Sequence, residues 1–260
     1  MGTRRHATVA LAAVVVSPAM ALSGCGLPGR VDRRPVPVPV ETTSRQLTAV
    51  EKLAESAARM NATTIGVTMR APGMTSDARL DPVGRKGTMR MELDRDDGKT
   101  LVVELLRVEQ DQYMRLSGLP GLPRRWLRIP AGSVAEGGAL DFMPEDDPSG
   151  AITLVKSIVD AKRDGGHTFL GTLDLTRSGW AGGRTPDEFT ERLTAVPFEV
   201  FTEPQGRWSW IEIDVPSVVP GLPMVRFSYH SWGEPVTAQA PPPGEVDDAP
   251  VGLLEDLVET

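Results

Sequence analysis

The side chains that most often carry chemistry in proteins are scarce in this sequence. Beyond residue 25, the chain of 260 residues contains two histidines, His167 and His230, and no cysteine. Both histidines fall in segments that we expect to be strands, and no metal-ligand spacing joins them. The sequence has no Gly-x-x-x-x-Gly-Lys phosphate loop, no His-Glu-x-x-His motif and no Gly-x-Ser-x-Gly elbow. We therefore interpret both histidines as structural and expect that the protein is not an enzyme.

Two groups of carboxylates could bind a cation. Three aspartates lie within residues 94–97, around a turn, and a Glu-Asp-Asp run at 145–147 precedes a predicted helix. Carboxylate oxygens are calcium ligands, and paired carboxylates can serve as acid and base. The alternative is a solvated turn and a helix cap, and both placements suit that alternative better. We predict no metal site and no cofactor.

The single cysteine, Cys25, has a specific chemical context. A basic start, Arg4 and Arg5, precedes an apolar stretch at 7–20, and the motif Leu-Ser-Gly-Cys follows at 22–25. The stretch is shorter than the roughly 20 apolar residues that cross a bilayer, which favours an export signal. The motif resembles the bacterial lipobox, which implies cleavage before Cys25 and attachment of diacylglycerol to its sulfur. The alternative is an ordinary secretory signal with a chance cysteine.

The composition is typical of a folded domain with acidic character. Apolar residues make up 40% of the chain and charged residues 24%, and the formal net charge is -7. This charge repels phosphate, so we expect no nucleic-acid partner. A lipid on Cys25 would hold the domain on the extracytoplasmic face of the cell membrane. The cytoplasmic membrane is therefore the first expected partner.

The chain divides into four parts by composition. Residues 1–24 are the expected lipoprotein signal peptide, and 25–43 are the lipidated cysteine and a Pro-rich tether. Prolines alternate with valines at 35–40, a pattern that favours an extended polyproline II segment. We expect a single domain at 44–246 and an acidic C-terminal tail at 247–260.

The apolar periodicity within the domain alternates between that of strands and that of helices. The first helix is expected near Ser44, with Thr43 and Gln46 at capping-box spacing, and it ends at Asn61. A helix at 150–163 and a short one after Thr185 are expected in the second half. Strands separated by short turns indicate an antiparallel meander, and the whole order indicates an α+β fold with helices on one sheet face. The expected strands are 63–69, 88–93, 100–108, 113–116, 126–129, 167–175, 198–201, 207–214, 223–230 and 235–240.

Methionines and other apolar residues recur on one face of the expected sheet. Methionine is flexible and suits surfaces that accommodate variable apolar partners, so such a face could hold an acyl chain. The alternative is that these side chains simply fill the core. On this interpretation the helix at 150–163 is a lid over the sheet. Periodicity suggests these lining residues: Met89, Met91, Leu105, Ile152, Val155, Ile158, Phe169, Leu173, Phe198 and Val200.

Three stretches of the sequence resemble a known family. They are 108–129, with Tyr-Met-Arg-Leu at 113–116 and Trp-Leu-Arg-Ile at 126–129; 197–216, with Pro-Phe-Glu-Val-Phe at its start; and 225–246, with Ser-Trp-Gly-Glu-Pro at 231–235. Together they resemble the actinobacterial lipoproteins LppX, LprG, LprA and LprF. The pattern spans most of residues 44–246.

This resemblance implies a fold similar to the LolA and LolB carriers, a strongly curved antiparallel half-barrel with a few helices covering its concave face. It implies binding of an acylated lipid or glycolipid in an apolar cavity, and its carriage or presentation in the cell envelope. A transporter or another envelope protein would be a further partner. The alternative is a regulatory or sensor lipoprotein of the RseB/MucB type, which acts through a protein partner on the same fold. Neither the lipid-carrier function nor the regulatory alternative implies catalytic residues.

Overall fold

The chain forms two compact units, Met1–Ser44 and Arg45–Thr260. The first unit lies wholly outside the residues that the structure describes, and so do the expected signal peptide, Cys25 and the Pro-rich tether. The structure, a computed structural model, describes residues 47–95, 97–118, 124–130, 133–134, 140–178 and 187–250.

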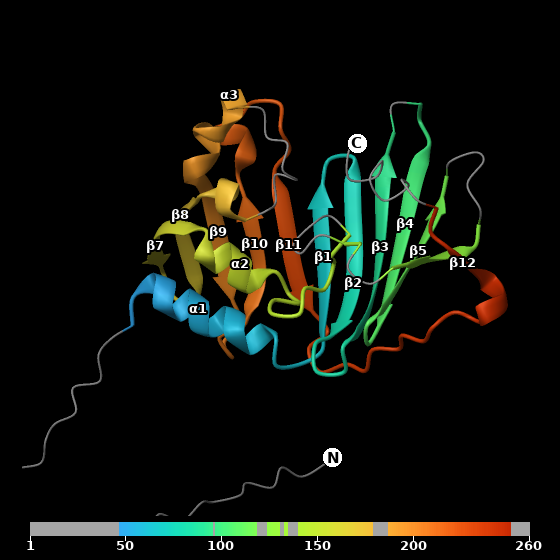
Figure 1. Ribbon diagram of the computed structural model, residues 1–260. Helices are drawn as coiled ribbons and strands as arrows, with labels where there is room; N and C mark the ends of the chain where they lie inside the picture. Colours follow the sequence, from blue (N-terminus) through green and yellow to red (C-terminus); the bar gives the residue numbers. More distant parts are fainter. Residues whose placement is uncertain are drawn as a thin grey trace, which may run out of the picture. The chain divides into compact units, whose positions relative to one another are not determined.

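The second unit is built on one open sheet of 12 strands (Figure 1). Their order across the sheet is β12-β6-β5-β4-β3-β2-β1-β11-β10-β9-β8-β7. The strands are β1 (Ile65–Ala71), β2 (Met74–Asp81), β3 (Lys86–Asp94), β4 (Thr100–Val108), β5 (Asp111–Ser117), β6 (Trp126–Ile129), β7 (Ile158–Asp164), β8 (Thr168–Leu173), β9 (Val196–Thr202), β10 (Trp208–Ile213), β11 (Val225–His230) and β12 (Val246–Asp248).

Two antiparallel meanders share this sheet. Strands β1 to β6 follow one another in sequence and in space, as do β7 to β11, and the pairing of β1 with β11 joins the two. The expected antiparallel pairing is therefore confirmed, although two of these eleven strands, β2 and β7, were not expected as strands. The last strand, β12, pairs with β6 in parallel, so the sheet as a whole is mixed. The large open sheet with few helices agrees with the curved α+β sheet that the sequence predicts.

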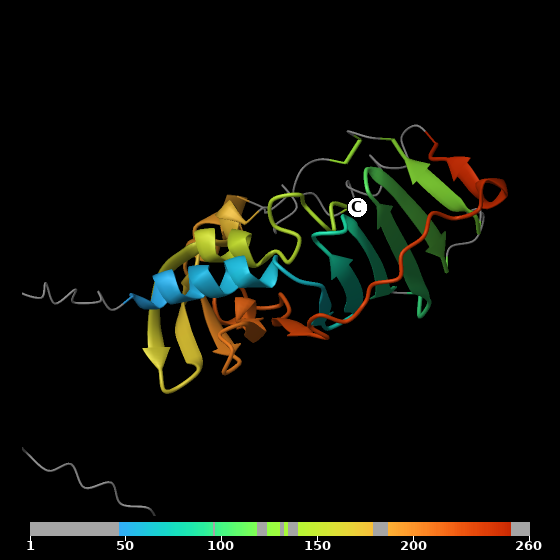
Figure 2. The ribbon, with the colours of Figure 1, turned by 90° about the horizontal axis from the view of Figure 1, so that it is seen from below.

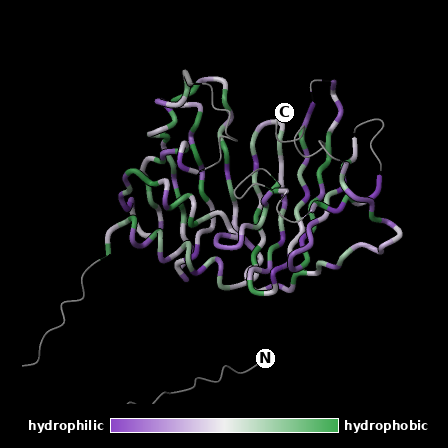
Figure 3. Tube along the Cα trace, in the orientation of Figure 1, coloured by the Kyte–Doolittle hydropathy of each residue, from purple (hydrophilic) through white to green (hydrophobic). Residues whose placement is uncertain are grey.

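Side chains alternate between the two faces of the sheet. Figure 3 shows hydrophobic and hydrophilic residues alternating along the strands. In β4, Val103 and Leu105 are buried while Glu104 between them is half-buried and ion-paired. Residues that lie directly opposite each other on neighbouring strands share a face. One such row runs across nine strands on the apolar face: Phe169, Val200, Ile211, Phe227, Met69, Ser76, Met91, Val103 and Leu116.

Helix α1 (Ala49–Met60) packs its apolar stripe on this face, beside helix α2 (Ala151–Lys156), over the half of the sheet formed by β7 to β11 (Figure 2). Leu53 and Met60 of α1 are fully buried. Thr48 caps the helix: its hydroxyl accepts from the Glu51 amide at 3.2 Å, and the Glu51 carboxylate accepts from the Thr48 amide at 2.8 Å. The helix therefore begins at Ala49 rather than near Ser44, and the expected pair Thr43 and Gln46 lies outside the described residues.

The expected helix at 150–163 is wrong beyond Ser157. The amide of Ser157 donates to the carbonyls of Thr153 and Leu154 and ends α2. The chain then pairs with β8 as the edge strand β7, from Ile158 to Asp164. Strand pairing satisfies the backbone groups that a helix would have satisfied within itself, and the charged side chains that follow Val159 stay in solvent.

Three smaller expectations also need correction. The segment 235–240 is extended but pairs with no strand among the described residues. Val246–Asp248 belongs to the sheet as β12, so the expected acidic tail does not begin at 247. Strand β2 was not predicted at all.

The remaining short helices are α3 (Asp187–Thr190) and the 3-10 turns Leu175–Arg177, Arg192–Ala195, Val215–Ser217 and Pro243–Glu245.

Candidate functional site

The apolar face of the sheet carries two hydrophobic clusters. The first lies between helices α1 and α2 and the half of the sheet formed by β7 to β11, and it extends to Ile65 and Leu80 on β1 and β2. The second lies on β4, β5 and β6, where Leu140 also contributes. Its buried strand residues are Val103, Leu105, Met114, Leu116, Leu127 and Ile129.

Most of the predicted lining residues lie in the first cluster. Four of them, on β8 and β9, are at most 5% exposed: Phe169, Leu173, Phe198 and Val200. The three on the expected lid, Ile152, Val155 and Ile158, are half-buried and pack against the same cluster. Ile158 does so from strand β7 and not from a helix. This group forms a packed core under the two helices.

The other predicted lining residues lie at the second cluster. Leu105 is 1% exposed and belongs to its centre. Met89 and Met91 are half-buried and pack along its edge, as do Leu93 and Leu101, which the sequence analysis did not select. Helices α1 and α2 both lie over the other half of the sheet (Figure 2). Neither helix covers the second cluster, against which Leu140 and Phe142, from the segment before α2, pack instead.

A buried carboxylate connects the two helices. Asp147, 5% exposed, accepts hydrogen bonds from the amides of Ile152 at 3.1 Å and Thr153 at 2.7 Å. It also accepts from the Asn61 side-chain amide at 3.2 Å, and Asn61 accepts in turn from the Ser149 amide at 3.0 Å. Asp147 thus caps the first turn of α2 and ties it to the end of α1. The helix-cap interpretation of residues 145–147 is therefore confirmed in part: Asp147 binds amides of the first turn, but the N-cap residue is Gly150.

Two buried aromatic residues contribute polar groups to the first cluster. Trp208 and Tyr229 are at most 3% exposed, and their rings meet edge to face with centroids 6.2 Å apart. Neither the Trp208 indole N–H nor the Tyr229 hydroxyl has a hydrogen-bond partner within the described part of the chain. Burial raises the pKa of the Tyr229 phenol, and the charge of Asp147 adds to this effect. The sequence analysis missed both residues because alternation marks them only as core.

The two histidines have neighbours that fit a structural role. The Nε2 atom of His230 lies 2.9 Å from the Thr68 hydroxyl, and the ring of His167 lies against Phe201 with centroids 6.1 Å apart.

In the turn at 94–97, Asp97 accepts from the Lys99 amide at 3.1 Å, and this bond lowers the pKa of Asp97. Asp96 lies outside the described residues. Across the described ranges, no group of three histidines, cysteines or carboxylates is placed to hold a metal ion.

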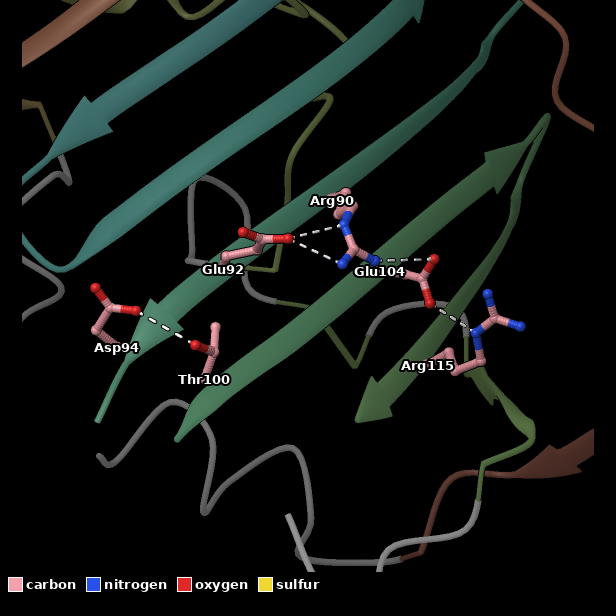
Figure 4. A network of polar contacts seen from close by, with 6 residues as sticks. All are labelled: Arg90, Glu92, Asp94, Thr100, Glu104 and Arg115. Atoms are coloured by element: carbon pink, nitrogen blue, oxygen red, sulfur yellow. Dashed lines mark hydrogen bonds and ion pairs between the residues drawn. The ribbon is translucent and has the colours of Figure 1, made fainter. Parts of the chain in front are cut away.

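The opposite face of the sheet carries a network of charged side chains (Figure 4). Glu104 accepts from Arg115 at 2.7 Å and lies 3.7 Å from Arg90, which also donates to Glu92 at 2.9 Å. The hydrogen bond from Arg115 lowers the pKa of Glu104 and raises that of Arg115. The Arg115 guanidinium also lies over the ring of Trp126, 4.6 Å from its centroid. Directly opposed pairs of unlike charge stabilise neighbouring strands.

This network predicts a component of acid stability. The Glu104 carboxyl has a lowered pKa in the folded protein, so its contribution is present above the unfolded value of about 4.5 and is lost as the pH falls through the folded value. Glu104→Gln should remove this component, at most about 1 kcal/mol for a partly exposed pair. Urea unfolding at a series of pH values measures it. In an Arg115→Met background the same substitution should have a smaller effect, because only Arg90, 3.7 Å from Glu104, is left to lower the pKa of that carboxyl, and an unchanged effect would contradict the assignment.

Comparisons with known proteins identify no family. No family model matches the chain, and no curated protein sequence is similar to it. Within the described ranges, none of the helices combines the length and the apolar character needed to span a membrane. The resemblance to the LppX and LprG lipoproteins therefore stays a prediction from the sequence.

Proposed function

We propose that this protein is a membrane-anchored lipoprotein that binds an acylated lipid or glycolipid and carries or presents it in the cell envelope. In this proposal the sheet is a half-barrel of the LolA type and its apolar face is the concave, ligand-binding face. The lipid on Cys25 would keep the domain at the membrane that contains its ligand. The proposal assigns no catalytic residue and no cofactor.

One observation carries the proposal: the apolar face is wider than the two helices that pack on it. Half-exposed Met89, Met91, Leu93 and Leu101 border the second cluster. An acyl chain laid along them would gain about 0.8 kcal/mol for each methylene removed from water. Methionine side chains adapt to ligands of different shape, which suits chains of different length.

A second candidate function has its own support. The predicted lining residues on β8 and β9 are buried in a packed core. A domain whose apolar face is filled by its own side chains would suit the regulatory alternative, in which the protein acts through a protein partner. The two functions differ in whether the second cluster receives a ligand.

Filling the second cluster tests the proposal. Met91→Trp adds a large ring to the half-exposed edge of this cluster, where an acyl chain would lie. We expect binding of a fluorescent fatty acid to weaken about tenfold, because the ring occupies the ligand's place, while the free energy of unfolding changes by less than about 1 kcal/mol.

Met224→Trp is the matched control, because Met224 is 41% exposed and belongs to neither cluster. This variant should bind the fatty acid as the wild type does. Two results would count against the lipid-binding proposal: no measurable binding by the wild type, or equal binding by both variants. Either would favour the regulatory alternative.

A further inference from the structure

A groove lies on the polar face of the sheet, away from the two helices. Its volume is about 400 Å³, within the range of roughly 300–1,000 Å³ that is typical of small-ligand sites. Strands β2, β3 and β4 form its floor, and Trp126 of β6 lies in its wall. The residues with polar groups around it are Asp77, Thr88, Arg90, Glu104, Thr237 and Gln239, and it is also lined by Met89, Leu105, Leu106 and Ala238.

Residues 234–244, which are extended up to Pro242 and then enter the 3-10 turn Pro243–Glu245, form the other wall, and we call them the strap. Figure 2 shows it crossing the sheet on the face opposite α1 and α2. Glu234 at one end pairs with Arg79 at 3.0 Å. At the other end, Arg125 donates to the carbonyl of Gly244 at 2.7 Å and pairs with Asp247 at 2.8 Å. The strap is therefore held at both ends.

Between these anchors, residues 237–239 of the strap make no hydrogen bond to the described part of the chain. Val236 is 8% exposed and fixes the strap to the body of the domain. Thr237 and Gln239 are exposed, and among the described residues neither their side chains nor the backbone groups of 237–239 make a hydrogen bond. Backbone groups are obligatory hydrogen-bonding groups, so this wall offers donors and acceptors to whatever enters the groove.

The charges on the floor of the groove balance each other. Asp77, Arg90 and Glu104 lie directly opposite one another on β2, β3 and β4. Arg115, next in the same row, holds Glu104 at 2.7 Å. The charges in this row alternate in sign and sum to zero. The row therefore provides no cluster of like charges that would bind an anion or a cation. It offers acceptor and donor groups in alternation, in positions that cross-strand pairing fixes.

We propose that this groove binds a saccharide chain. A neutral ligand in which every ring carries hydroxyl groups, each both a donor and an acceptor, matches a floor of alternating carboxylates and guanidinium groups and a wall of free backbone. The apolar part of the Trp126 ring would contact the C–H groups of a sugar ring. A purely apolar acyl chain would remove the partly exposed charges of this row from water and offer them no hydrogen bond, which is costly. This site is separate from the lipid-binding face and goes beyond the function proposed above.

Calorimetric titration of the detergent-solubilised full chain tests the proposal, with hexasaccharides of glucose, mannose and N-acetylglucosamine as probes. We expect at least one to bind at micromolar to millimolar concentration. Arg90→Met should weaken that binding about tenfold, the loss expected for one hydrogen bond to a charged group. Gln239→Ala, a change on the exposed strap that removes no internal bond, should weaken it about fivefold.

Two matched controls lie elsewhere on the described surface. Arg226→Met removes an arginine from β11 that pairs with Glu212 at 3.4 Å, and Gln205→Ala changes an exposed turn. Both should bind the saccharide as the wild type does. The proposal is overturned if no hexasaccharide binds, if an extended peptide binds in its place, or if Arg90→Met and Gln239→Ala leave binding unchanged. Fatty-acid binding, which Gln239→Ala should retain, reports separately on the lipid-binding proposal.

Discussion

Replacing Cys25 with alanine should abolish the attachment of lipid to this protein. If the residues at 22–25 are a lipobox, the thiol of Cys25 is the group that accepts diacylglycerol, and alanine has no nucleophile in its place. We expect the variant either as an uncleaved precursor or as a soluble protein, with no acylated mature form. Membrane fractionation, metabolic labelling with palmitate and the intact mass of the product measure this result.

Ser17→Ala, within the apolar stretch, is the control, because it leaves the thiol and the motif unchanged. It should be cleaved and acylated as the wild type is. A Cys25→Ala product that is still cleaved, labelled and membrane-bound would show that the cysteine is not the anchor.

Gly171→Ala should cause the largest loss of stability among simple substitutions in the second half of the sheet. A Cβ atom at Gly171 would overlap the carbonyl oxygen of Asp160 and lie 2.8 Å from Cε1 of Phe198. The carbonyl belongs to the neighbouring strand β7 and cannot move without disturbing the pairing with β8. We expect a loss of about 3 kcal/mol, at the upper end of overpacking effects, seen as a lower urea midpoint with the same slope.

Gly166→Ala is the matched control, because a Cβ atom there meets nothing within 4 Å. It should change the free energy of unfolding by less than about 0.5 kcal/mol. The pair of variants decides between the strand that the structure shows at 158–164 and the helix that the sequence predicts there. If Gly171→Ala were as mild as Gly166→Ala, the close pairing of β7 with β8 would be wrong.

That segment illustrates where sequence periodicity reaches its limit. Ile152, Val155 and Ile158 fit one helical face, and the spacing continues without a visible break. The helix ends at Ser157, whose amide closes the last turn of α2. The residues that follow pair with strand β8, which is their neighbour both in sequence and in space. Val159, 55% exposed, is apolar but faces solvent on the edge strand, so residue type alone does not predict its position.

The strands predicted from alternation at 63–69 and 88–93 were found with bounds shifted by up to about two residues, and a strand with polar core positions was missed. Strands β4 and β6 have the bounds that the sequence predicts, 100–108 and 126–129. Strand β2 was missed because its inward positions include Ser76 and Ala78, which are small or polar, although they are only 7% and 6% exposed. The expected strand at 235–240 has the right extended shape, but its neighbours leave it no pairing partner.

The sequence predicted which face of the sheet carries the candidate site, but not where on that face the site lies. Period-two alternation puts Met89, Leu105 and Phe169 on the same side of the sheet, and the cross-strand registers agree. Which half of that side the helices cover depends on long-range packing, such as the bonds of Asp147 to α2 and to Asn61. No local pattern predicts that choice, so the sequence did not separate the core under the helices from the second cluster.

The central claim, that the apolar face holds an acylated lipid, is tested most directly by native mass spectrometry. The protein would be purified without its acyl anchor, as a form that starts at Gly26, from two different bacterial hosts. The account predicts protein ions that carry one acyl lipid in each preparation, and loss of this adduct in Met91→Trp but not in Met224→Trp. Protein ions free of lipid from both hosts, under conditions that keep the domain folded, would contradict it.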